Sequence, residues 1–254
     1  MPNYDPSSSK DVNFVKRHRE RAHYDQEAVF SVLDASQLAH VGFTIPSLNK
    51  GDSKSEYHQE DYPHVIPMIY GRVGTTIYLH GYISTRLLKA LSGPPLGSPE
   101  EELEQTSKAC VTVSIVDALI VSVASFHCSN NYRSVCAFGS ARLVTDRDEK
   151  IKALTATVNK QFLGGIKWGD SRPVKDSELK TTSVVAIEIE AASAKISNSD
   201  AEEEKEDLSD PTVMSTYWSG RIPVKTFFGT PERFENSSAP IPDYISKLDN
   251  ARIQ

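Results

Sequence analysis

The stretch NNYRSVCAFGSARLV, residues 130–144, has the alternating pattern of a β-strand and decides the fold class of this chain. One face of the strand carries Tyr132, Ser134, Cys136, Phe138 and Ser140. The opposite face carries Arg133, Val135, Ala137, Gly139 and Ala141, so it is small everywhere except at Arg133. Small residues let another backbone, a partner subunit or a flat ligand come close. Arg133 could meet an anion there, or it could extend from the strand edge into water.

Other strand patterns lie on both sides of this stretch. Residues 110–116 and 119–127 precede it with short connections, which predicts an antiparallel meander because tight turns join antiparallel neighbours. Residues 64–70 and 75–80 flank the sequence GRVG and predict a β-hairpin. Three more strands are predicted at residues 39–46, 184–189 and 217–228. The predicted fold class is therefore mainly β, an antiparallel barrel of six or seven strands with a few outer helices.

Helical patterns are few. Short helices are predicted over residues 24–33 and 84–91, and the second is opened by a hydroxyl residue and closed by GPP. A longer helix is predicted from a capping-box pattern at Thr145 to the glycines at 164–165. We expect residues 1–16 to be a flexible tail, residues 17–245 to be a single domain, and residues 246–254 to be a C-terminal tail.

The charge of the chain argues against two classes of partner. Its 254 residues are 39% hydrophobic and 24% charged, which is the composition of a globular protein. A formal net charge of −6 argues against nucleic acid and anionic membranes as partners, because both attract a positive surface. The basic run KRHRER, residues 16–21, is interpreted as a solvated helix or tail. No stretch approaches the roughly 18 apolar residues of a membrane span, so a cytoplasmic protein is predicted.

The cysteines do not predict a disulfide framework or a zinc ribbon. Cys110, Cys128 and Cys136 have neither CxxC spacing nor an even count. We expect small, buried or half-buried thiols in a reducing compartment. The acidic segment 199–210 is interpreted as a solvated loop, and no metal site is predicted. The sequence also lacks GxGxxG and P-loop patterns, which argues against a Rossmann or NTP site.

The sequence IYLHGYISTRLLK, residues 77–89, contains a candidate phosphate site. A strand leads here into the start of a helix, where free backbone N–H groups and the helix dipole attract anions. Ser84, Thr85, Arg86 and Lys89 add hydroxyl and cationic donors at the same end. A plain helix cap followed by a solvated arginine would have the same sequence. His80 ends the strand just before this site, although a lone histidine more often has a structural role.

The motifs FHCSNNYRSVCAFGSARLVTD, LKTTSVVAIEIEAASAKIS and YWSGRIPV occur in this order, with a helix after the first. Together they resemble the pyridoxamine 5′-phosphate oxidase-like, FMN-binding split-barrel proteins, and the nitroimidazole-resistance branch is the most similar. The resemblance runs from about Arg17 to about Tyr244. It implies a split β-barrel that forms a homodimer with two FMN sites, each built from both chains. Loops near residues 49–60, 92–107 and 199–210 look longer than usual and are expected to be insertions.

The resemblance also implies roles for individual residues. The flavin phosphate would be held by Ser84, Thr85 and Arg86, with Lys89 as a possible further donor. Backbone groups of Ile66, Pro67 and Met68 would face the ring edge. Arg133 and Ser134 would line the isoalloxazine or ribityl side, and Trp218 would lie near the flavin of the other subunit. His80 corresponds to a histidine linked with the active site in the nitroimidazole-resistance branch, and it is the candidate catalytic residue.

Two departures argue against a true pyridoxine-phosphate oxidase. Such enzymes tend to have a Ser-Arg-Lys run at the phosphate junction, whereas this chain has Thr85, Arg86 and Leu87. They also have an Arg-x-His element after the tryptophan, and no histidine follows Arg221 at that spacing. The predicted function is an FMN-dependent oxidoreductase acting on a small molecule or electron donor. The alternatives are a non-catalytic module that binds or senses flavin, haem or a deazaflavin, and a structural dimer with a vestigial site.

Overall fold

The computed structural model describes residues 3–45, 62–92 and 107–253. Six strands close into an antiparallel barrel in the order β2, β3, β4, β7, β6, β5, with β5 pairing again with β2. They are β2 Leu38–Phe43, β3 His64–Val73, β4 Thr76–Tyr82, β5 Ser107–Val121, β6 Ser129–Leu143 and β7 Thr182–Ser197. Outside this ring, β1 Ala22–His23 pairs with β7 and β8 Gly220–Pro223 pairs with β5. The mainly β, antiparallel barrel predicted from the sequence is confirmed.

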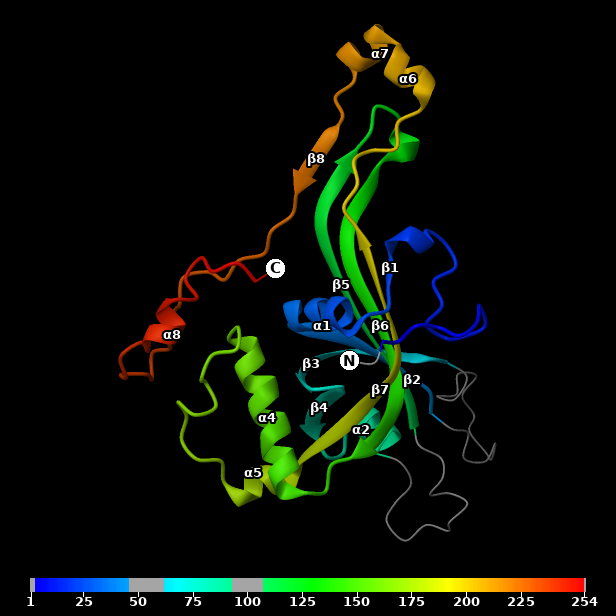
Figure 1. Ribbon diagram of the computed structural model, residues 1–254. Coiled ribbons are helices and arrows are strands. Elements are labelled where there is room, and N and C mark those ends of the chain that lie inside the picture. The colour runs from blue at the N-terminus through cyan, green and yellow to red at the C-terminus, as the bar shows by residue number, and fades with distance from the viewer. Residues whose placement is uncertain (1–2, 46–61, 93–106, 254) are drawn as a thin grey trace, which may run out of the picture.

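Helices surround the barrel and its extensions (Figure 1). The α-helices are α1 Gln26–Ala35, α2 Arg86–Leu91, α4 Arg147–Gln161, α5 Asp176–Thr181, α6 Lys205–Ser209, α7 Pro211–Thr216 and α8 Asp243–Ser246. The 3-10 turns of the described residues are η1 Arg19–Arg21 and η3 Ser125–His127. The predicted helices at 24–33 and from 145 correspond to α1 and α4. No helix in the described ranges is long and apolar enough to cross a membrane.

The barrel core is filled by alternate strand residues and closed by α1 and α2. Val29, Val32 and Leu33 of α1 are fully buried among the inward side chains of the strands. Leu87, Leu88 and Leu91 of α2 join the same cluster. A second cluster on the outer face of β4 and β7 packs Tyr78 and Val184 against α4 and α5. The helices therefore fix the shape of the barrel from two sides.

The small face of β6 points into this core. Val135, Ala137 and Ala141 are buried there, and α1 packs against β6 and β7. The small residues of β6 could admit another backbone, a partner subunit or a flat ligand, and within this chain they admit another backbone. A Cβ atom at Gly139 would lie 1.9 Å from the carbonyl oxygen of Glu188, where the pairing of β6 with β7 is shifted by a bulge. Gly139 is therefore required by the barrel's own β7.

Two predicted strand boundaries are wrong. Residues 110–116 and 119–127 were expected to be two strands, but β5 runs unbroken from Ser107 to Val121 because a bulge after Val116 absorbs one extra residue. Residues 125–127 form the turn η3. The strand predicted over 217–228 is reduced to the four residues of β8, because only Gly220 to Pro223 pair with β5.

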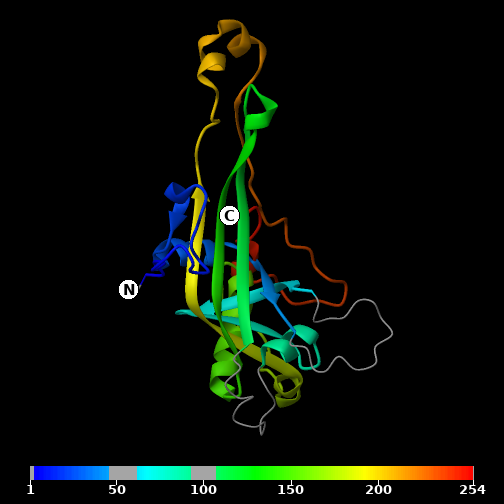
Figure 2. The same cartoon turned by 90° about the vertical axis from the view of Figure 1, so that its right-hand side faces the viewer.

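The hairpin of β5 and β6 and the chain that follows β7 extend well beyond the barrel (Figure 1). We call this extension the arm, made of residues 116–132 and 198–223. Figures 1 and 2 show α6 and α7 at its far end in two perpendicular views, with β8 along its side. Apolar side chains on the arm are exposed, among them Val116, Leu119, Phe126, Trp218 and Ile222. The chain therefore presents apolar surface well away from its core.

The segment predicted as a tail contacts the sheet in the structure. Tyr4 packs against the barrel core, and its backbone N–H donates to the carbonyl of Tyr24. Asn13 is buried and its amide donates to the carbonyls of Tyr4 and Ala192. The predicted insertion near 49–60 and most of that near 92–107 lie outside the described residues. The third, 199–210, contains the short helix α6, and the domain boundaries themselves stay predictions.

Candidate functional site

The barrel opens between β3 and β4. The two strands pair only from Tyr70 to Val73 and from Thr76 to Leu79, next to their connecting turn. Beyond this point β4 continues to Tyr82 on β7, while His64 to Ile69 of β3 stay paired with β2. Within the described residues, His64 to Ile69 of β3 therefore have no strand partner on the edge that faces β4. We call this opening the split.

Ile66, Pro67 and Met68 lie along one side of the split. Their β2 partners are Val41, His40 and Ala39. The side chains of Ile66 and Met68 pack against the barrel core, whereas Pro67 is exposed. Because only one edge of this segment is used by β2, backbone groups on the other edge are available to a ligand. Whether backbone groups of this segment contact a ligand stays a prediction.

His80 lies where the two strands separate, one residue beyond Leu79. It faces outward on β4, opposite Val184 of β7, and it is half-buried. Its Nδ1 atom is buried and has no hydrogen-bond partner among the described residues. Burial lowers the pKa of this imidazole, so the neutral form predominates at neutral pH. A buried ring nitrogen without a partner is costly, and a polar group of a ligand could satisfy it.

The candidate phosphate residues follow at the end of β4. Ser84, Thr85 and Arg86 are consecutive and exposed, and Lys89 is one helical turn further on. Thr85 is the cap residue of α2, yet its side chain makes no capping bond, and none of the four side chains has a partner in the described residues. These hydroxyl and cationic groups are therefore free to bind an anion.

Local packing explains why the chain turns at this point. A Cβ atom at Gly81 would lie 3.1 Å from Cδ1 of Leu88, so the absence of a side chain lets α2 fold back onto β4. The backbone N–H of Ile83 donates to the carbonyl of Thr181 at 3.2 Å, which ties the junction to the end of α5. The three leucines of α2 are buried in the core and anchor the helix. The hydroxyl and cationic residues are left on its outer end.

Arg133 is already paired within its own chain. Its Nε and Nη2 atoms donate to the two carboxylate oxygens of Asp117 at 2.9 and 2.7 Å. The Asp117 carboxylate raises the pKa of Arg133 above its usual value. Asp117 is the extra residue of the β5 bulge, and it lies between the two strands predicted at residues 110–116 and 119–127. The sequence carries no signal for this ion pair, because the bulge shifts the register of β5 on β6 and Arg133 is paired in the ladder with Ile115.

Ser134 and Trp218 share the arm end of the sheet with Arg133. The Ser134 hydroxyl donates to the Lys195 carbonyl at 3.3 Å. Trp218 precedes β8 and is exposed, with its indole lying over Gly220. Neither side chain meets the split.

A single chain does not bring the two groups of predicted site residues together. His80 pairs with Val184 of β7, whereas Arg133 pairs with Ile196 of the same strand. At about 3.3 Å per residue, those twelve residues span roughly 40 Å. Residues at the split and residues near the arm therefore form two separate clusters in one chain.

The comparison with protein families agrees with this architecture. The family model described as pyridoxamine 5′-phosphate oxidase matches residues 25–196, which is more than half of the chain. The chain therefore belongs to the pyridoxamine 5′-phosphate oxidase-like family. Among curated proteins, none matches the chain significantly.

Several solved structures are similar to this chain over most of its length. The flavocytochrome Anf3 from Azotobacter vinelandii is 31% identical with a TM-score of 0.75, covering 97% of this chain and 100% of that one. An FAD and haem binding protein from Mycobacterium smegmatis is 24% identical with a TM-score of 0.73, covering 92% and 99%. A putative 5-nitroimidazole antibiotic resistance protein from Bacteroides thetaiotaomicron is 20% identical with a TM-score of 0.45, covering 72% and 96%. The similarity to the first two includes the arm, because it extends over nearly the whole chain.

Proposed function

We propose that this chain binds a flavin nucleotide, FMN, at the split and acts as an oxidoreductase on a small molecule. The observation that carries the proposal is the split itself, with an unpaired backbone edge, a buried histidine nitrogen without a partner and an anion-binding cluster around one opening. A flavin has a matching set of groups, namely a polar ring edge and a phosphate. Membership of the pyridoxamine 5′-phosphate oxidase-like family supports the same ligand.

Each group at the split would have a defined task. Arg86 neutralises the phosphate, with Lys89 one turn away, and the hydroxyls of Ser84 and Thr85 donate hydrogen bonds to its oxygens. Backbone groups of residues 66–68 orient the ring edge. His80, whose pKa is lowered, holds or accepts a proton at Nδ1. When bound, a flavin accepts and donates electrons or hydride, while the protein supplies position and electrostatics.

The second cluster, Arg133, Ser134 and Trp218, would act through a homodimer. Because these residues lie far along β7 from the split, they reach a flavin only if a second copy places its arm beside the split of the first. The exposed Leu119 and Ile222, which are neighbours on β5 and β8, support such an arrangement, since exposed apolar surface favours association. Arg133 then orients the ligand with its charge already balanced by Asp117.

A second candidate function is a protein that holds haem as well as flavin. The observation favouring it is the 31% identity over 97% of the chain with a protein described as a flavocytochrome. In this case the chain would bind or sense its cofactors, or pass electrons between them, without a small-molecule substrate. The physiological donor and a cytoplasmic location remain predictions.

An absorption spectrum of the protein as purified separates these candidates. Flavin alone predicts the yellow flavin bands, whereas flavin with haem adds an intense Soret band. Chromatography of the released cofactor then decides between FMN and FAD. Reduction of the bound flavin by NADH or NADPH faster than reduction of free FMN would support turnover, and a slow rate would favour the binding or sensing function.

Substitution of the anion-binding arginine tests the site. Arg86→Ala is expected to weaken FMN binding by about 1.5–3 kcal/mol, the usual contribution of a charge-assisted hydrogen bond. Isothermal titration of the apoprotein measures this change. Arg147→Ala is the control, because Arg147 is an exposed arginine in the first turn of α4, paired with Asp176. Equal FMN affinity in the two variants would contradict the phosphate assignment, and no FMN binding by the wild type would contradict the function.

A further inference from the structure

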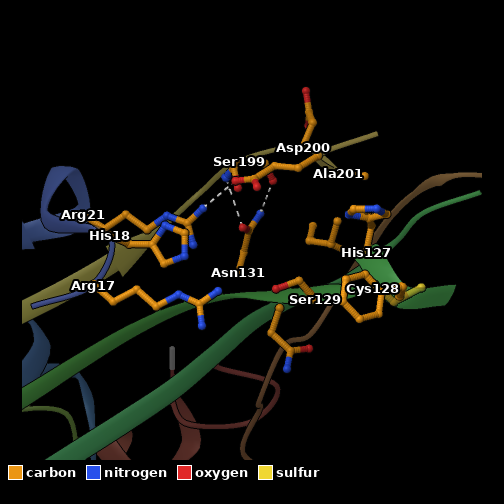
Figure 3. Close-up of a pocket in the computed structure, with 14 residues that line it drawn as sticks. Arg17, His18, Arg21, His127, Cys128, Ser129, Asn131, Ser199, Asp200 and Ala201 are labelled. Atoms are coloured by element: carbon orange, nitrogen blue, oxygen red, sulfur yellow. Dashed lines mark hydrogen bonds and ion pairs between the residues drawn. The ribbon is translucent and has the colours of Figure 1, made fainter. Parts of the chain in front are cut away.

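A pocket of about 290 Å³ lies along the arm, between the segment before β1 and the turn that joins β5 to β6. Three segments distant in sequence form its walls: residues 17–21, residues 126–131 and residues 199–202. Figure 3 shows Arg17, His18 and Arg21 entering from one side and His127 and Ser129 facing them from the other. The basic run interpreted from the sequence as solvated thus forms one wall of a pocket.

Among the charged side chains that line this pocket, Arg17 has no acidic partner in the described residues. Arg21 donates to Glu202 at 3.0 Å, and Asp200 accepts from Arg221, which lies outside the pocket, at 3.1 Å. The side chains of both acids are mostly exposed, at 72% and 95%. Arg17 makes no hydrogen bond or ion pair with any described residue, and its guanidinium points into the pocket (Figure 3). The pocket therefore has a positive charge available to a ligand.

One residue that lines the pocket, Asn131, is buried and has hydrogen-bond partners for both polar atoms of its side chain. Asn131 is 1% exposed, and its amide donates to the carbonyl of Ser199 at 2.9 Å. Its side-chain oxygen accepts from the backbone N–H of Ser199 at 3.1 Å and from the hydroxyl of Ser197. These bonds hold the start of β6 to the chain after β7. Two of the three segments that line the pocket are thus tied to each other before a ligand binds, which reduces the entropy cost of binding.

The turn of the basic segment also has a defined geometry. His18 has a φ of 54°, which is a left-handed conformation uncommon for residues other than glycine. This turn leads into η1 and then into β1, which is anchored on β7. The uncommon backbone conformation of His18 therefore lies between two arginines, Arg17 and Arg21, that both line the pocket.

The opposite wall offers an aromatic ring. Phe126 is 92% exposed, which is unusual for a phenylalanine, and its ring contacts the His127 imidazole edge to face at 5.5 Å between centroids. Ile120 adds apolar surface, and the exposed Asn130 adds an amide that can pair with a heterocycle. A ligand that fits these groups has a negative charge near Arg17 and a flat ring near Phe126.

We propose that this pocket binds a nucleoside monophosphate, with its phosphate at Arg17 and its base against Phe126. The pocket volume of about 290 Å³ is close to the lower limit of small-molecule sites, about 300 Å³, so the ligand is a small one such as a mononucleotide. A charged phosphate bound to a guanidinium supplies most of the specificity, and stacking on the ring adds affinity. The site does not depend on flavin binding at the split.

Titration with adenosine 5′-monophosphate tests the proposal. Isothermal titration is performed on the full chain with FMN present in excess, so that the split is occupied if it binds flavin. We expect AMP to bind, with adenosine and inorganic phosphate each binding more weakly. Arg17→Gln should weaken AMP binding at least about tenfold. Phe126→Ala should weaken AMP and adenosine but not inorganic phosphate.

Lys16→Gln is the matched control, because Lys16 belongs to the same basic run but does not line the pocket. It should leave the AMP affinity unchanged. Absence of AMP binding, or an equal loss in Lys16→Gln and Arg17→Gln, would overturn the proposal. Competition between AMP and FMN, or loss of AMP binding in Arg86→Ala, would assign the ligand to the split and would also overturn it. The FMN titration itself reports separately on the flavin function.

Discussion

At the scale of single residues, Gly139 is where one added methyl group has the most direct consequence. Its Cβ would overlap the carbonyl oxygen of Glu188 at 1.9 Å, and backbone atoms cannot yield as a flexible side chain can. Gly139→Ala is therefore expected to lower the free energy of unfolding by about 2 kcal/mol or more, the upper range for overpacking a core. Urea denaturation measures this loss.

Gly229→Ala is the control for this prediction. A Cβ atom at Gly229 meets nothing within 4 Å, so its unfolding free energy should change by no more than about 0.5 kcal/mol. If Gly139→Ala were as stable as Gly229→Ala, the close approach of β7 would not determine the choice of glycine.

The sequence predicted the position of Arg133 but not the residue with which it pairs. The alternation of the strand identified it as a cation at the end of a small face. Its partner Asp117 could not be identified, because a bulge changes the strand register by one residue and leaves no pattern in the letters. The lack of a partner for the His80 nitrogen was also beyond prediction, since it depends on what the folded chain brings near it.

At the scale of elements, α1 depends on its cap. The Asp25 carboxylate accepts from the backbone N–H of Ala28 at 2.8 Å, and this helix carries three fully buried residues of the barrel core. Asp25→Ala is expected to lower the free energy of unfolding by about 1 kcal/mol, measured by urea denaturation.

Asp25→Asn separates the hydrogen bond from the charge. Asparagine caps helices about as well as aspartate, so this variant should stay within a few tenths of a kcal/mol of the wild type. A loss equal to that of Asp25→Ala would attribute the effect to charge near the helix N-terminus instead.

Elements with a strong local signal were predicted, and those set by distant contacts were not. The helices α1 and α4 have polar caps and helical spacing, and both begin within a few residues of their predicted starts. The split could not be located from the sequence, because β3 and β4 look like one continuous hairpin. Only the register of β4 on β7 and of β3 on β2 shows where the two strands diverge.

At the scale of the whole molecule, the arm makes a testable prediction about assembly. Leu119 and Ile222 are cross-strand partners on the arm, and they are 44% and 46% exposed. Burying such a pair between two chains stabilises a dimer. We expect a mass near twice 28.1 kDa by light scattering, and Ile222→Asp should shift the protein toward the monomer.

Lys152→Gln, an exposed position on α4 that changes the net charge by the same amount, should leave the dimer intact. A monomeric wild type at micromolar concentration would rule out a shared flavin site. Dissociation in both variants would point to net charge and not to the arm.

The order of motifs along the chain predicted the barrel, but not the arm or its pocket. The barrel follows from adjacent strands and from a family pattern spread over most of the chain. The pocket joins residues 17–21 with residues 126–131 and 199–202, and nothing in their separate sequences indicates that they meet.

The separation of the split from Arg133 along β7 has a genetic consequence if the dimer forms as proposed. Each of its two sites would take one half from each chain. A cell with one allele damaged at Arg86 and another damaged at Trp218 would assemble some mixed dimers. In these, one site would carry both defects and the other would carry none. Two inactive alleles could thus complement each other, whereas two alleles damaged in the same half could not.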